Sequence, residues 1–116
     1  MFVAMNRFRV VKGREADFEA VWASRTTRLD EMAGFVGFHL LKGPEGEDHT
    51  LYASHTVWTD RACFEAWTRS EQFRAAHRDA GRNKGLYLGH PAFEGFESVL
   101  GEDAPRAGAA TSSRVA

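Results

Sequence analysis

Three polar or amphipathic side chains in this 116-residue sequence stand in apolar surroundings, and Asn6 is the first of them. Every second residue around it is apolar, in the order Phe2, Ala4, Phe8 and Val10. An amide on such a strand face must be hydrogen-bonded, because an unpaired polar group loses its hydration on burial. Two interpretations follow: neighbouring backbone satisfies Asn6, or Asn6 donates to a ligand held over the sheet.

His77 and Trp67 are the other two candidates. His77 follows Phe73-Arg-Ala-Ala, and the two alanines leave room for a flat ligand beside an imidazole that could bind iron. Alternatively, His77 interacts favourably with the C-terminal end of its helix. Trp67 comes one helical step after Phe64, so it either fills the core or forms a wall for a planar ligand.

A basic cluster, Arg78, Arg82 and Lys84, follows His77 directly and suits either paired carboxylates or a solvated loop. The remaining histidines, His39, His49, His55 and His90, show no HxH or HExxH spacing, so the sequence does not predict a metal site built from protein ligands alone. We interpret His39 and His55 as satisfied core or interface residues. Cys63 is the only cysteine, which excludes an intramolecular disulfide and a Cys-based zinc site.

The periodicity of the sequence predicts the elements that position these residues. Alternation predicts a strand over residues 2–11, and three- to four-residue spacing predicts a helix from Arg14 to about Leu29. Residues 35–41 and 49–58 form an expected hairpin around the turn 42–48. After Thr59-Asp60 comes a helical stretch that Ser70 breaks in two.

The C-terminal part is expected to contain a loop over residues 81–89, a last strand over 93–100 and a disordered tail over 101–116. The order strand, helix, strand, strand, helix, strand predicts an α+β, ferredoxin-like split βαβ fold with a four-stranded antiparallel sheet in one domain, residues 1–100.

Composition narrows the functional classes. With 15 Lys and Arg against 16 Asp and Glu, the net charge of -1 gives no field that would attract nucleic acid or a membrane surface. The N-terminus alternates and lacks the apolar run of a signal peptide, and no segment reaches about 18 consecutive apolar residues. We therefore expect a cytoplasmic protein.

Asn6, Phe64-Glu-Ala-Trp67 and Ser70-Glu-Gln-Phe73-Arg-Ala-Ala-His77 together resemble the IsdG-type haem-degrading monooxygenases of the antibiotic biosynthesis monooxygenase superfamily. The resemblance spans roughly residues 2–100. Within that group, Leu41-Lys-Gly-Pro-Glu, the segment 47–55 and Tyr87-Leu-Gly-His-Pro are most similar to the rhizobial and related proteobacterial branch.

This resemblance implies a homodimer whose two sheets meet in an α/β barrel, with one haem per subunit serving as both cofactor and substrate. His77 would be the proximal iron ligand, Trp67 would ruffle the porphyrin, and Asn6 would hydrogen-bond on the opposite side of the ring. On the residues alone, Arg78 and Arg82 are the candidates to meet the haem propionates. The reaction would consume O₂ and electrons from an external donor, a separate reductase or small reductant, because no GxGxxG fingerprint is present.

Two alternatives remain open. The first is a cofactor-independent monooxygenase of polycyclic phenols from the same superfamily, for which Asn and Trp would also suit. The second is a non-catalytic dimer that only binds or buffers haem.

Overall fold

The computed structural model describes residues 1–25, 27–77 and 85–103. Its elements are β1 (Phe2–Val11), α1 (Glu15–Ala23), a 3-10 turn (Leu29–Glu31), β2 (Phe35–Glu45), β3 (His49–Trp58), α2 (Arg61–Thr68), α3 (Glu71–Ala76) and β4 (Tyr87–Glu97). The four strands form one antiparallel sheet in the order β2-β3-β1-β4. The predicted ferredoxin-like α+β fold is therefore confirmed.

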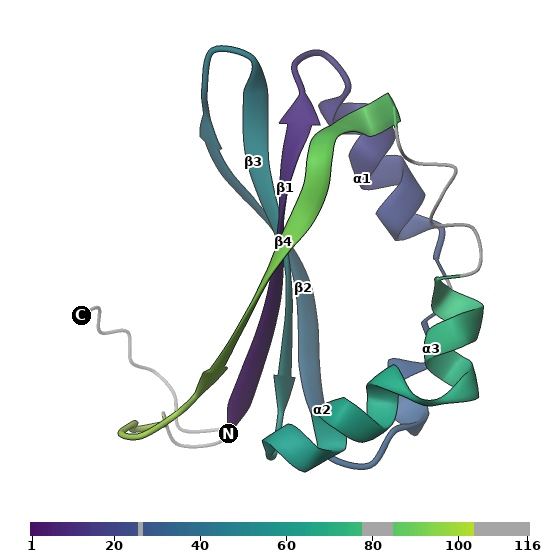
Figure 1. The fold of residues 1–116 in the computed structure, drawn as a ribbon, viewed down its shortest axis with the longest axis vertical. Coiled ribbons are helices and arrows are strands. Elements are labelled where there is room, and N and C mark those ends of the chain that lie inside the picture. The colour runs from purple at the N-terminus through teal and green to yellow at the C-terminus, as the bar shows by residue number, and fades with distance from the viewer. Residues whose placement is uncertain (26, 78–84, 104–116) are drawn as a thin grey trace, which may run out of the picture.

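The helices all cover the same face of this sheet, and no described helix lies on the other face (Figure 1). The central strand β1 directs Phe2, Ala4, Phe8 and Val10 toward the helices, and all four are buried. Asn6 shares their parity and pairs with Ser54 of β3 on one side and Phe93 of β4 on the other. The amide thus lies at the middle of the sheet, facing the helices.

Local caps explain why the second helical stretch is two helices. The carboxylate of Asp60 accepts a hydrogen bond from the Cys63 backbone N–H at 2.9 Å and starts α2. The hydroxyl of Ser70 accepts one from the Phe73 N–H at 3.0 Å and starts α3. The predicted break at Ser70 is therefore confirmed, and it turns α3 away from the axis of α2 (Figure 1).

Both predicted edge strands were wrong in their bounds. β2 continues to Glu45 through the expected turn, and β4 begins at Tyr87 inside the expected loop and ends at Glu97, short of Leu100. Register shifts near Pro44 and Pro91 absorb these residues. β2 and β4 are the outer strands of the sheet, where the missing N–H of proline need not break a ladder of hydrogen bonds.

The predicted length of the first helix was also wrong. α1 ends at Ala23, where the Ser24 hydroxyl donates to the Val21 carbonyl at 2.8 Å, instead of continuing to Leu29. Arg28 then takes a left-handed conformation with φ of 55°, and Leu29 enters the core from a separate 3-10 turn. The apolar residues at helical spacing therefore belong to two short elements.

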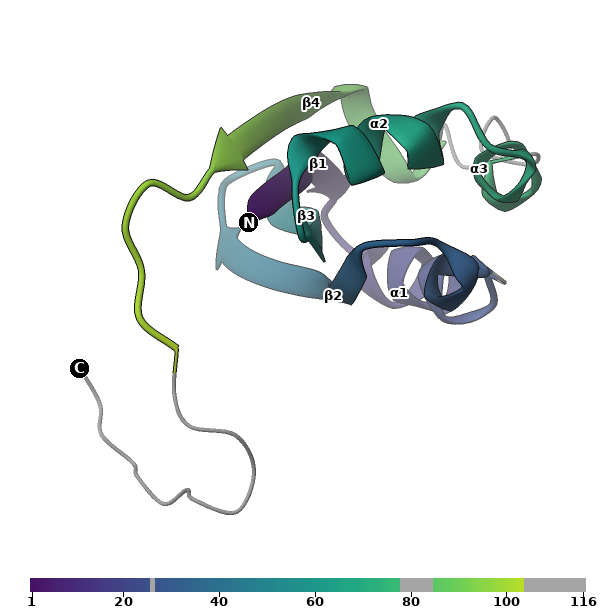
Figure 2. The ribbon, with the colours of Figure 1, turned by 90° about the horizontal axis from the view of Figure 1, so that it is seen from below.

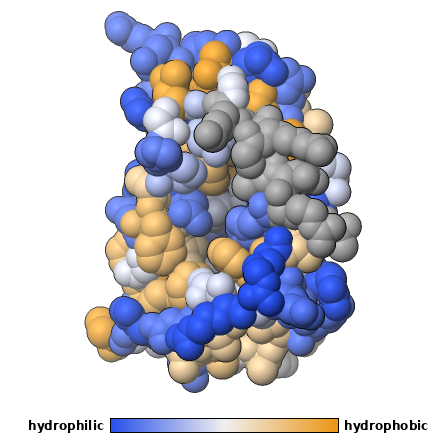
Figure 3. Space-filling view, turned by 45° about the vertical axis from the view of Figure 1, so that its right-hand side comes forward, coloured by the Kyte–Doolittle hydropathy of each residue, from blue (hydrophilic) through white to orange (hydrophobic). Residues whose placement is uncertain are grey.

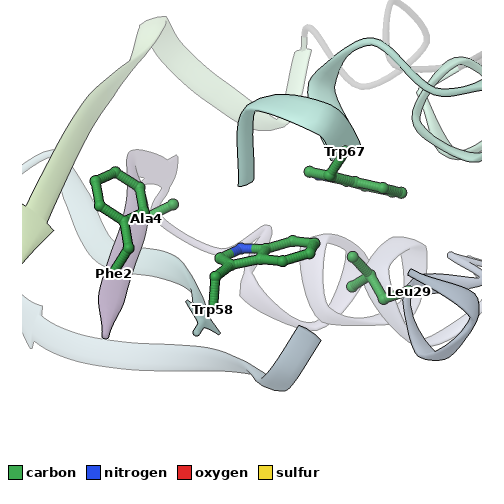
Figure 4. Packing of buried hydrophobic residues seen from close by; sticks show 5 residues of the cluster. All are labelled: Phe2, Ala4, Leu29, Trp58 and Trp67. Atoms are coloured by element: carbon green, nitrogen blue, oxygen red, sulfur yellow. The ribbon is translucent and has the colours of Figure 1, made fainter. Parts of the chain in front are cut away.

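Two buried clusters hold the helices on the sheet. One contains Phe2, Ala4, Leu29, Trp58 and Trp67, with the indoles of Trp58 and Trp67 facing each other (Figure 4). The other contains Phe8, Val10, Phe18, Tyr52 and Leu86, under α1.

The segment after β4 extends away from the sheet and helices, as the view from below shows (Figure 2). In the described part of the chain, no helix has the length and apolarity to cross a membrane.

Candidate active site

A cavity of about 410 Å³ lies between the helix-covered face of the sheet and the helices. Its walls include all three residues that the sequence singled out, Asn6, Trp67 and His77. On this side the molecule is hollowed near its centre, with hydrophobic side chains around the hollow and a hydrophilic band below it (Figure 3). The volume falls in the range of small-molecule sites, about 300–1,000 Å³.

His77 directly follows α3, and one contact fixes its tautomer. The Nδ1 atom lies 2.8 Å from the Phe73 carbonyl oxygen, so Nδ1 carries the proton and donates. The Nε2 atom then keeps its lone pair, which is the state that binds a metal. Partial burial of the ring lowers the pKa of His77, against the opposing effect of the Phe73 hydrogen bond, and favours the neutral form. The imidazole also stacks on the Phe73 ring, with centroids 4.1 Å apart.

Trp67 belongs to the core and to the cavity wall at once. Only 6% of it is exposed, and its indole lies 6.2 Å from that of Trp58, measured between centroids. On its other side it meets Phe73 edge-on at 5.3 Å and His77 at 6.4 Å. Trp67 therefore fills the core and also lines the cavity, and its role as a wall for a planar ligand stays a prediction.

Asn6 faces the same space from the floor of the cavity. Within the described ranges, no backbone or side-chain group hydrogen-bonds its amide, so the expected alternative of a backbone-satisfied Asn has no support there. Phe93, its neighbour on β4, stacks on Phe64 of α2 with centroids 5.7 Å apart and 11° between the planes. Among the described residues the amide therefore has no hydrogen-bond partner, and it lines the cavity beside the aromatic ring of Phe93.

Arg25 is a cavity residue that the sequence reasoning missed. Its guanidinium lies 4.1 Å over the Trp22 ring, and Trp22 in turn stacks on Phe38 with centroids 5.8 Å apart. Burial lowers the pKa of Arg25. A guanidinium does not lose its proton in proteins, so the cavity wall carries a fixed positive charge. The only sequence signal was its spacing of three from Trp22. The predicted Arg78 and Arg82 lie outside the described residues.

The other histidines stay away from the cavity. His39 and His55 pair across β2 and β3 with the opposite parity to Leu40 and Ser54, which places them on the sheet face without helices. The described residues contain no group of three or more His, Cys, Asp or Glu side chains that could hold a metal ion.

Residues 1–79 match the family model for antibiotic biosynthesis monooxygenases. The chain belongs to this family. A curated relative from Staphylococcus haemolyticus, a haem oxygenase (staphylobilin-producing), is 34% identical over 83 residues, which are 68% of this chain and 75% of the relative.

Two solved structures share the fold. One is the haem degrader MhuD from Mycobacterium tuberculosis with two haems bound in its active site, at a TM-score of 0.68, 29% identity and coverage of 89% of this chain and all 100% of MhuD. The other is SnoaB, a cofactor-independent oxygenase from Streptomyces nogalater, at a TM-score of 0.61, 26% identity and coverage of 86% and 94%. Solved structures with this fold thus include a haem-bound haem degrader and a cofactor-independent oxygenase.

Proposed function

We propose that this chain is a haem-degrading monooxygenase. It binds haem as its substrate, opens the porphyrin ring with O₂ and electrons from an external donor, and releases iron and a linear tetrapyrrole. One observation carries the proposal: the Phe73 carbonyl accepts a hydrogen bond from the Nδ1–H of His77. The Nε2 atom therefore keeps its lone pair, on a side chain that lines a cavity of about 410 Å³. A neutral imidazole with a fixed tautomer is the usual proximal partner of haem iron.

The walls fit the rest of the ligand. A porphyrin is flat and apolar, and the cavity offers aromatic faces from Trp67, Phe64 and Phe93. Its propionates are anionic, and Arg25 supplies a charge that does not titrate near neutral pH. Arg78 and Arg82 stay candidates for the same role on sequence grounds alone.

Each residue then has a task. His77 would hold the haem iron through its Nε2 atom. Trp67, backed by Trp58, is stiff enough to press on the macrocycle and distort it, because a well-packed wall resists being pushed back. Asn6 would donate a hydrogen bond to the bound substrate, and an amide can do so at any pH. When bound, the haem iron supplies the activation of O₂ that the protein's side chains lack.

We further propose a homodimer in the cytoplasm that takes electrons from a separate reductase or a small reductant. The one-sided sheet supports the homodimer, since no helix of the described residues covers its second face (Figure 1). A closer kinship with the rhizobial and proteobacterial branch is also a proposal, supported by the segments around Leu41 and Tyr87.

Haem titration tests the proposal, with His77→Ala as the variant and His90→Ala as the matched control. His90 is exposed on β4 and does not line the cavity, so its loss removes an imidazole without touching the site. We expect the parent and His90→Ala to bind haem at one per chain with the same Soret band. His77→Ala should lose the band and most of the affinity.

Ascorbate under air is then added to the haem complexes. Loss of the Soret band with release of iron supports degradation. Stable binding without loss favours the haem-buffering alternative, and absence of haem binding favours the cofactor-independent oxygenase. An unchanged spectrum in His77→Ala would contradict the ligand assignment.

A further inference from the structure

Strand β3 carries a hydroxyl on every second residue of the face that the helices cover, in the order Thr50, Tyr52, Ser54 and Thr56. Ser54 pairs directly with Asn6 of β1, so the two side chains lie next to each other on the floor of the cavity. Only 8% of Ser54 is exposed. A buried hydroxyl therefore accompanies the Asn6 amide, and the sequence reasoning did not single it out.

The other hydroxyls of this row are engaged by protein groups. Thr50 and Tyr52 each donate to a glutamate of α1. The Thr56 hydroxyl accepts a hydrogen bond from the indole N–H of Trp58 at 3.1 Å. Within residues 1–25, 27–77 and 85–103, no group hydrogen-bonds the Ser54 hydroxyl. Buried polar groups are nearly always hydrogen-bonded, so a hydroxyl left over in a cavity floor indicates a partner from outside the chain.

We propose that Ser54 is a second hydrogen-bond donor beside Asn6, and that the two side chains together hold one small acceptor, an anion or an oxygen atom, over the floor of the cavity. The inference rests on the proposed function and adds to it a residue that contacts the small ligand held next to the haem.

The distance between the two donors suits a shared acceptor. Directly opposed residues of an antiparallel pair have Cβ atoms about 4.5–5.5 Å apart. Two donors can reach one atom when about 6 Å or less separates them, since each hydrogen bond spans about 2.7–3.2 Å. A serine hydroxyl also rotates to suit its partner, and an amide offers two N–H groups. The pair can therefore donate to a single atom.

The surroundings make these hydrogen bonds effective. Leu40 flanks Ser54 on β2 and Phe93 flanks Asn6 on β4, so the polar pair stands between two apolar side chains. Hydrogen bonds are stronger in such apolar surroundings than in water. His77 lines the same cavity from the helix layer, while Asn6 and Ser54 line it from the sheet. A small ligand of the iron would then lie between the two layers, within reach of both donors.

Fluoride is a suitable probe, because it is a small anion that binds ferric haem and accepts hydrogen bonds from nearby donors. A hydrogen bond to a charged group is strong enough to change a dissociation constant by about tenfold to about a hundredfold. Removal of the Ser54 hydroxyl should therefore raise the dissociation constant of fluoride by at least about tenfold, whereas haem itself should bind as before.

Fluoride titration of the ferric haem complexes at pH 7, followed by absorption spectra, tests the inference. Ser54→Ala removes the hydroxyl, and Ser54→Thr keeps one at the same position. The matched control is Thr56→Val, which removes a hydroxyl from the same face of β3 that Trp58 already engages. We expect weaker fluoride binding in Ser54→Ala, and affinity close to that of the parent in Ser54→Thr and Thr56→Val. Circular dichroism checks that each variant is folded.

A double variant tests whether the two donors act on the same ligand independently of each other. Asn6→Ala alone should weaken fluoride binding, and Asn6→Ala/Ser54→Ala should weaken it further than either single change. If the double variant bound fluoride exactly as Asn6→Ala does, Ser54 would act only by positioning Asn6, which would overturn the inference.

The remaining outcomes separate this inference from the proposed function. Haem binding with equal fluoride affinity in the parent and Ser54→Ala overturns the inference and leaves the proposed function intact. An equal loss in Ser54→Ala and Thr56→Val, or a loss that Ser54→Thr does not restore, assigns the effect to packing and also overturns the inference. A parent that binds no haem overturns both.

Discussion

Shortening the Trp67 side chain separates its two roles, because the residue is both core and cavity wall. Trp67 is 6% exposed and packs between Trp58 and Phe73. Replacing such a ring by a methyl group typically destabilises a domain by about 3–5 kcal/mol. The free energy of unfolding of a small domain is only about 5–15 kcal/mol, so Trp67→Ala should remove a large share of it.

Trp67→Phe keeps a ring against the same neighbours and loses only part of the buried surface. We expect about 1–2 kcal/mol of destabilisation from this change. The matched control is Trp58→Phe, since Trp58 is 0% exposed in the same cluster and does not line the cavity. Both Phe variants should therefore lose similar stability, while only Trp67→Phe changes the wall that meets the ligand.

Urea unfolding gives the stabilities, and loss of the haem Soret band under ascorbate and air gives the activity, at a temperature where every variant is folded. Activity should fall in the order Trp58→Phe, Trp67→Phe, Trp67→Ala, while haem binding is retained. A loss of less than about 1 kcal/mol in Trp67→Ala would refute the core assignment. Equal activity of Trp58→Phe and Trp67→Phe would refute the pressing role of the indole.

Three further perturbations test other parts of the structure. Asn6→Ala should bind haem as the parent does and degrade it more slowly. If the amide acts as a donor, the activation free energy should rise by about 3–4 kcal/mol, which single-turnover kinetics measures. Gly34→Ala should lose about 2–4 kcal/mol in urea unfolding, because φ is +81° there and a Cβ would lie 2.7 Å from that of Cys63. The Thr50 hydroxyl donates to Glu15 at 2.7 Å and lowers the pKa of that carboxyl, so this stabilisation is present above the ordinary pKa and lost as pH falls through the lowered one. Thr50→Val should therefore be less stable at pH 7 and lose less stability between pH 7 and pH 3, and an equal loss would contradict this.

Those parts of the fold with local signals could be predicted from the sequence. Period-two alternation predicted β1 and the sheet face on which Asn6 lies. Asp60 and Ser70, which are favourable capping residues, predicted the starts of α2 and α3. These patterns depend on neighbours a few residues away. The ferredoxin-like arrangement also followed, because the order of strands and helices along the chain leaves few possible folds.

The strand ends and the Arg25 site depend on distant partners and could not be predicted. β4 includes Gly89 and Pro91 only because it lies at the edge of a sheet beside β1, where a register shift is tolerated. Arg25 lines the cavity because α1 ends two residues earlier and the Arg25 guanidinium packs over the Trp22 ring. The tautomer of His77 likewise could not be predicted, because it depends on the Phe73 carbonyl, which reaches Nδ1 only when α3 is folded.

Ser70 explains how the chain holds Trp67 and His77 in one geometry. Its hydroxyl donates to the Trp67 carbonyl at 2.7 Å and accepts from the Phe73 N–H at 3.0 Å, so one side chain joins the end of α2 to the start of α3. The Phe73 carbonyl then accepts a hydrogen bond from the Nδ1–H of His77, which lies one turn further along the chain. A continuous helix would place Phe73 roughly opposite Phe64, at about 100° per residue, and would carry His77 out of the cavity with it. The break in the helix therefore sets the angle between the indole and the imidazole, and the sequence places it by a single capping residue.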